Sequence, residues 1–134
     1  MTPEQQIRDL LIDSCHSVIE AERYFLDRID DPELLRLLFT IARDEHGHLG
    51  DAPMQAAYFI SQHPSDMLAP YESDLMAMLP KVDGYAGHVA LALGKTRSVP
   101  GRQMILRGLA ERREPADGEG FDAWLFEEAL SFYE

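Results

Sequence analysis

The chain has 134 residues, of which 46% are apolar and 27% charged, and this is the size and composition of one globular domain. Its 12 basic and 24 acidic side chains give a net charge of −12, which argues against binding to nucleic acid, because such binding depends on neutralising phosphates. No apolar run is long enough to span a bilayer, no secretory signal is visible and Cys15 is the only cysteine, so we expect a cytoplasmic protein that contacts no membrane.

The first third of the chain predicts two helices. Residues 7–29 carry apolar side chains at helical spacing and predict one amphipathic helix. The second helix starts at Asp31-Pro32-Glu33, since Asp can cap a helix, Pro suits its first position and Glu favours its positive end. The stripe of the first helix comprises Ile7, Leu10, Leu11, Cys15, Val18, Ile19, Leu26 and Ile29.

The rest of the chain predicts five more helices, separated by proline-containing breaks at 63–66, 79–84 and 98–100. Residues 53–62 and 84–95 are apolar on nearly all sides, which predicts buried helices, whereas residues 71–79 and 101–113 are apolar on one side only. Residues 121–133 form the last predicted helix, and no segment reads as a strand. Segment 84–95 is also rich in glycine and alanine, so we expect its neighbours to approach closely. Buried and surface helices alternate with a period of about 34 residues, which is typical of helical-pair repeats.

Two segments, 49–79 and 79–109, resemble HEAT-like α-helical repeats. Asp51 and Asp83 match the acidic turn of the repeat, and small residues at 56–57 and 90–94 match its first helix. The resemblance covers roughly residues 31–133, although the usual Arg after the turn is replaced by Gln55 in the first segment. It implies an all-α fold, a short α-solenoid of about seven helices stacked as antiparallel pairs in one domain, 1–134. Because such solenoids bind other macromolecules, it also implies binding rather than catalysis.

The charges are segregated along the chain. Residues 1–94 carry 6 basic and 16 acidic side chains, residues 95–113 carry 6 basic and 1 acidic, and residues 114–134 carry 7 acidic and none basic. This pattern fits either a solvated surface that keeps the protein soluble or an acidic face that attracts a basic protein. The arginines at 102, 107, 112 and 113 form a basic patch that the acidic C-terminal segment can neutralise. The predicted partner-binding residues are Asp51, Glu72, Asp74, Asp83, Glu127 and Glu128.

One motif, "DEHGH" at 44–48, suggests a metal. Glu45 and His48 have the Glu-x-x-His spacing of ferritin-like metal sites, and Glu22 could supply a further carboxylate. No second Glu-x-x-His motif is present, and glycines at 47 and 50 favour a simple helix end instead.

Three other features have plain structural interpretations. Cys15 is expected to be a buried structural thiol, and His88 a histidine of the core. Trp124 and Phe126 would cap the core, or would anchor an interface if they were exposed.

The sequence therefore predicts a non-catalytic protein-binding module that needs no cofactor and whose partner is basic. By analogy it is similar to small bacterial immunity proteins, which mask a toxin. Two alternatives stay open: a ferritin-like metal-binding bundle that uses Glu22, Glu45 and His48, and a scaffold or adaptor of a larger complex. The oligomeric state is left open.

Overall fold

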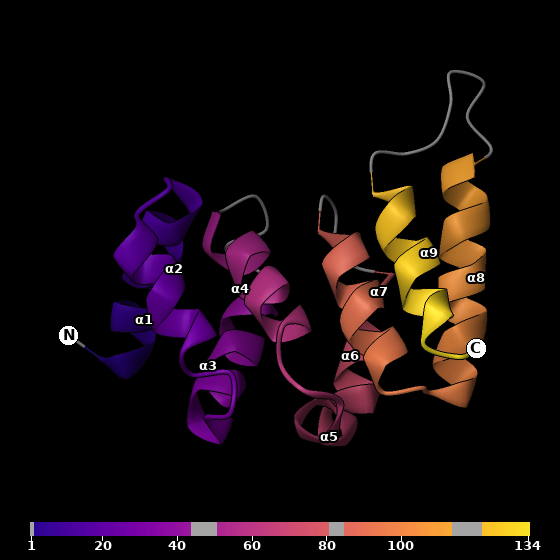
Figure 1. Ribbon diagram of the computed structural model, residues 1–134, viewed down its shortest axis with the longest axis horizontal. Helices are drawn as coiled ribbons and strands as arrows, with labels where there is room; N and C mark the ends of the chain where they lie inside the picture. Colours follow the sequence, from indigo (N-terminus) through magenta and orange to yellow (C-terminus); the bar gives the residue numbers. More distant parts are fainter. Residues whose placement is uncertain (1, 44–50, 81–84, 114–121) are drawn as a thin grey trace. The chain divides into compact units, whose positions relative to one another are not determined.

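The computed structural model describes residues 2–43, 51–80, 85–113 and 122–134, and all regular elements in these ranges are helices (Figure 1). The helices pack against one another, so the predicted all-α, helical-repeat class is confirmed. The chain divides into two compact units, residues 1–64 and 65–134, which are described in turn. The organisation of residues 1–134 as one domain stays a prediction.

The N-terminal unit contains α1 (Pro3–Cys15), α2 (Ile19–Leu26), α3 (Pro32–Ala42) and α4 (Asp51–Ser61). Helix α4 packs against both α1 and α3, while α2 packs against α1. The rings of Phe25 and Phe59 stack with their centroids 4.5 Å apart, joining α2 to α4 in the core. Phe39 of α3 and aliphatic residues of α1, α3 and α4 complete the core, with Leu11, Leu35, Leu38, Ile41 and Ile60 fully buried.

The prediction of one helix over residues 7–29 is wrong, because the chain turns sharply at Ser17. Ser17 has a positive φ of 68°, and the backbone N–H of Val18 donates to the carbonyl of Asp13 at 3.0 Å. This bond and the left-handed residue define a Schellman motif, a common way to end a helix. Glycine usually occupies the left-handed position, and because serine stands there instead, the end of α1 could not be predicted from the sequence. Nor is Cys15, at the end of α1, the buried thiol expected, since it is half-buried.

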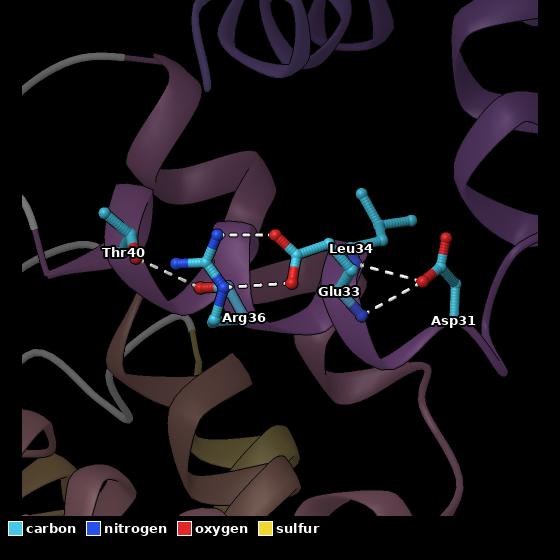
Figure 2. A network of polar contacts seen from close by, with 5 residues as sticks. All are labelled: Asp31, Glu33, Leu34, Arg36 and Thr40. Carbon is cyan, nitrogen blue, oxygen red and sulfur yellow. Dashed lines mark hydrogen bonds and ion pairs between the residues drawn. The ribbon is translucent and has the colours of Figure 1, made fainter. Parts of the chain in front are cut away.

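The predicted start of α3 is confirmed in detail (Figure 2). One carboxylate oxygen of Asp31 accepts hydrogen bonds from the backbone N–H groups of Glu33 and Leu34, at 3.0 and 3.3 Å. Glu33 then forms an ion pair with Arg36 one turn later on the exposed side of α3. The opposite side of α3 is buried, so the cap fixes where a core helix begins.

Replacing Asp31 with alanine is expected to lower the free energy of unfolding by about 1 kcal/mol, because two N–H groups of the first turn lose their acceptor. Urea unfolding followed by far-ultraviolet circular dichroism measures this change. Asp30→Ala is the matched control, since it removes the same charge from an exposed neighbour. An equal loss in both variants would mean that charge, and not the cap, stabilises α3.

The C-terminal unit contains α5 (Ser65–Leu68), the 3-10 helix η2 (Ala69–Tyr71), α6 (Glu72–Met78), α7 (Ala86–Lys95), α8 (Val99–Arg113) and α9 (Ala123–Ser131). Helix α7 packs against α6, α8 and α9, and α8 also packs against α9. The described ranges hold more helices than the seven expected, because the first predicted helix is two and because α5 and η2 precede α6.

Helix α7 confirms that the glycine- and alanine-rich segment is a buried helix. Every residue from Val89 to Gly94 is buried, and Figure 1 shows α7 beside α9. A Cβ atom added at Gly94 would lie 2.5 Å from the backbone oxygen of Ala129, and one added at Gly87 would lie 2.6 Å from Cδ1 of Leu125. The two glycines therefore let α9 lie directly against α7, with both helices running in the same direction.

Helix α8 begins at Val99, inside the proline-containing break predicted at 98–100, and the preceding Ser98 ties three parts of this unit together. The Ser98 hydroxyl accepts from the N–H of Gly101 at 2.9 Å and donates to the Glu72 carboxylate at 2.7 Å. The Ser98 carbonyl accepts from the Tyr133 hydroxyl at 2.7 Å. This one capping residue thus joins α6, α8 and the end of the chain.

Candidate partner-binding surface

Helix α9 presents a tryptophan and two carboxylates on its outer side. Its inner side is buried through Ala123, Leu125, Phe126 and Ala129. Trp124 is 59% exposed, and Glu127 and Glu128 are exposed three and four positions later. Residues at this spacing are neighbours on one helix face. We call Trp124, Glu127 and Glu128 the α9 face.

Helix α7 places a cation near one end of the α9 face. Lys95 is half-buried, and burial lowers the pKa of its ammonium group while the neighbouring Glu128 carboxylate opposes this change. The negative charge of Glu128 is therefore partly neutralised by the ammonium group of Lys95. Removing Glu128 would leave a partly desolvated cation, so a binding test at this position needs a stability control.

At the other end of α9, an ion pair holds the helix on α8. The Nε atom of Arg112 donates to the Asp122 carboxylate at 2.7 Å, and the two side chains are only 23% and 9% exposed. The same guanidinium donates to the carbonyl of Gly108 and stacks over the Phe126 ring at 4.0 Å. Arg112 of the basic patch is thus neutralised by a residue of the acidic C-terminal segment, as expected.

Beside this ion pair lies a pocket of about 250 Å³. It is smaller than the roughly 300–1,000 Å³ of typical small-molecule sites. Apolar and charged side chains share its lining. Leu79, Pro80, Met104, Arg107, Gly108, Glu111, Arg112 and Phe126 line it.

Five of the six predicted partner-binding residues are described by the structure, and of these five only Glu127 and Glu128 share the α9 face. Glu72 holds the cap of α8, and Asp74 is half-buried on the same helix as Glu72. Asp51 belongs to the N-terminal unit, where it is exposed and lies 3.5 Å from His16. Asp83 lies outside the described residues. Contributions of Asp51, Glu72 and Asp74 to partner binding stay predictions, and Glu72 has an evident internal role.

The residues of the metal alternative are mostly outside the described part of the chain. Glu22 is exposed on α2, whereas Glu45 and His48 lie outside the described residues. Within the described ranges, no group of three or more His, Cys, Asp or Glu side chains is arranged to hold a metal ion.

Cys15 and His88, both predicted to be structural residues, have surroundings that shift their pKa values. Burial raises the pKa of the Cys15 thiol, and the nearby Asp51 carboxylate acts in the same direction, so the reactive thiolate is disfavoured. His88 is half-buried in α7, and this burial lowers the pKa of its imidazole, although the Asp122 carboxylate acts in the opposite direction. The neutral imidazole is therefore favoured.

An exposed apolar surface on α1 and α2 was not predicted from the sequence. Val18, Ile19 and Leu26 were predicted to lie on the apolar stripe of one long helix, whereas all three are exposed. The turn at Ser17 gives α2 its own orientation, and Ala21 and Phe25 become the buried residues of α2 instead. The only signal in the sequence was indirect, namely the spacing of four between Ala21 and Phe25.

No family model, no curated protein and no solved structure matches this chain. Across the described residues, no helix combines the length and apolarity that crossing a membrane requires. The fold and the α9 face define an all-α protein with an exposed aromatic and acidic helix surface. The resemblances to HEAT-like repeats and to immunity proteins stay predictions.

Proposed function

We propose that this protein is a cytoplasmic, non-catalytic binding module for a basic protein, and that it acts as an immunity-type inhibitor by covering its partner. The observation that carries the proposal is the α9 face, where an exposed tryptophan and two exposed carboxylates share one side of a helix.

The chemistry of the α9 face suits a basic partner. Tryptophan is one of the residue types enriched at the energetic centre of protein interfaces. Its indole ring attracts Arg and Lys side chains, and carboxylates one turn away can pair with the same cations. The net charge of −12 adds long-range attraction, which raises the association rate with a basic partner.

Trp124→Ala is expected to weaken binding of the partner by at least about 2 kcal/mol, or roughly thirtyfold, because an exposed tryptophan at the centre of an interface is a typical anchor. The partner is first identified as the stoichiometric protein that co-purifies with the untagged chain, and then titrated in purified form by calorimetry. Trp124 is the sole tryptophan, so a change in its fluorescence on binding reports directly on the α9 face.

Val99→Ala is the matched control, because Val99 is 80% exposed but lies on α8, at the opposite end from the α8–α9 connection. We expect it to change affinity by less than about 0.5 kcal/mol. Association should also slow as salt rises. The proposal would be contradicted by a co-purifying partner that is acidic, or by a partner whose association rate does not change with salt concentration.

The two alternatives give different results on the same material. Iron or manganese bound in stoichiometric amount, and lost in Glu45→Gln, would identify the metal-binding bundle. Co-purification of several proteins as one assembly, with no loss of activity in any of them, would identify a scaffold or adaptor.

A further inference from the structure

Helix α2 carries apolar side chains on the side that faces solvent. Ile19 and Leu26 are 64% and 40% exposed, and they lie seven residues apart, which is two helical turns on one face. Val18, at the N-cap of α2, and Ile12, on the adjacent α1, are each 39% exposed. The buried side of α2 is separate, since Ala21 and Phe25 are 2% and 1% exposed. We call Ile12, Val18, Ile19 and Leu26 the α2 surface.

These exposures differ from the scattered apolar residues that any protein surface carries. Four of the six large exposed apolar side chains of the described residues fall within fifteen positions, on two helices that pack together. Residues spaced by seven on a helix are the pattern with which one helix packs along another. A helical segment is therefore the occupant that the geometry fits.

The charges around the α2 surface specify the occupant further. Residues 1–31 contain eight acidic and three basic side chains. Two of the three basic groups have internal partners: Arg8 pairs with Glu4, and Arg28 donates to the Tyr24 carbonyl at 2.9 Å and stacks on the Tyr24 ring. The third, Arg23, is exposed on α2 between Ile19 and Leu26, where the neighbouring carboxylates outnumber it. The acidic side chains that flank Ile19 and Leu26 on α2 are all exposed, and they are Glu20, Glu22 and the following Asp27.

We infer that the α2 surface is a docking site for a basic amphipathic helix of a partner protein. The large apolar side chains of that helix would cover Ile19 and Leu26. Its Lys and Arg side chains would face Glu20, Glu22 and Asp27. A second copy of this chain is the disfavoured occupant, because it would bring two surfaces of the same negative sign together. The site is on a different helix and in a different unit from the α9 face, so it does not depend on the proposed function of that face.

The test uses the full chain and a synthetic peptide of leucine and lysine, about 14 residues long, whose leucines follow helical spacing. A peptide of the same composition in scrambled order is the control for amphipathicity. Fluorescence anisotropy of the labelled peptides measures the dissociation constants. We expect the amphipathic peptide to bind at least about tenfold more tightly than the scrambled one.

Ile19→Gln combined with Leu26→Gln should weaken binding of the amphipathic peptide by at least about tenfold, because two apolar contacts are lost. The charge variant Glu22→Gln combined with Asp27→Asn should weaken binding at low salt only. Raising the ionic strength from about 0.01 M to about 1 M shortens the Debye length from about 30 Å to about 3 Å, so the effect of the charge variant should vanish while that of the apolar variant persists.

Val99→Gln is the matched control, since it makes an apolar-to-polar change at an exposed site in the other unit and should alter affinity less than about twofold. Circular dichroism confirms that each variant keeps its helix content. Equal binding of both peptides, or an effect of Val99→Gln as large as that of Ile19→Gln/Leu26→Gln, would overturn the inference. A dimer in sedimentation equilibrium that Ile19→Gln/Leu26→Gln dissociates would also overturn it, by making a second copy the occupant.

These outcomes are distinguishable from failure of the proposed function. Loss of peptide binding in the α2 variants with an unchanged Trp124 fluorescence response to the purified partner assigns the two surfaces separate roles. Loss of the Trp124→Ala effect leaves the α2 result intact.

Discussion

Replacing Gly94 with alanine is expected to destabilise the C-terminal unit by about 2 kcal/mol. The added Cβ would lie 2.5 Å from the backbone oxygen of Ala129 and 2.9 Å from its Cα, so α7 and α9 would have to separate. Overpacking of this kind costs about 1–3 kcal/mol, and a backbone neighbour places the cost at the upper end. Alanine has a higher helix propensity than glycine by about 1 kcal/mol, which offsets part of the loss. Urea unfolding measures the net change.

Gly87→Ala tests whether the backbone contact is the cause. Its added Cβ would lie 2.6 Å from Cδ1 of Leu125, which can rotate, and 3.0 and 3.1 Å from the Cβ atoms of Leu125 and Asp122. None of these neighbours is a backbone atom, so we expect a smaller loss than at Gly94. Ala110→Ser, which adds one atom at an exposed position of α8, should change stability by less than about 0.5 kcal/mol. A Gly94→Ala protein as stable as the wild type would mean that α7 and α9 do not pack as described.

Arg112→Ala is expected to lower the free energy of unfolding by about 3 kcal/mol. It would leave the Asp122 carboxylate, which is only 9% exposed, without its ion-pair partner at 2.7 Å. Breaking a buried pair by removing one member costs about 3–5 kcal/mol, and the partial exposure of Arg112 places this pair at the lower end. The variant also loses the stacking of the guanidinium on Phe126, which holds α8 and α9 together.

Arg107→Ala is the control for Arg112→Ala, because Arg107 is exposed on the same helix and lines the same pocket. Removing it should change stability by less than about 0.5 kcal/mol. The double variant Arg112→Leu/Asp122→Leu, which removes both charges, should recover part of the loss seen for Arg112→Ala. Equal losses for Arg107→Ala and Arg112→Ala would show that the total positive charge of α8 matters and the buried pair does not.

The Gly94 and Arg112 variants also bear on the proposed function, because both residues position α9. Gly94 sets how closely the inner side of α9 approaches α7, and Arg112 fixes the N-terminal end of α9 to α8. Both therefore position the outer side of the same helix, where Trp124, Glu127 and Glu128 lie. A binding site on a helix fixed at two points loses less conformational entropy when a partner binds.

The sequence by itself determined the all-α class and the positions of most helices. Proline, a capping residue and an apolar pattern coincide at the starts of α3 and α8, and these local signals act within one helical turn. The burial of α7 could also be predicted, because a helix with apolar or small residues on all sides has no polar face to expose to solvent.

Only the tertiary structure decided which carboxylates share a face and which apolar residues stay exposed. The turn at Ser17 depends on a left-handed residue that is not glycine, so the apolar spacing of residues 7–29 was compatible with one helix as well as two. Glu72 and Glu128 are both acidic residues on helices, yet one holds the Ser98 hydroxyl and the other lies on the α9 face beside Lys95. Helix periodicity fixes the angular position of a residue on its own helix. The surroundings of that residue depend on contacts between helices distant in sequence, and these contacts separated a capping partner from a candidate binding residue.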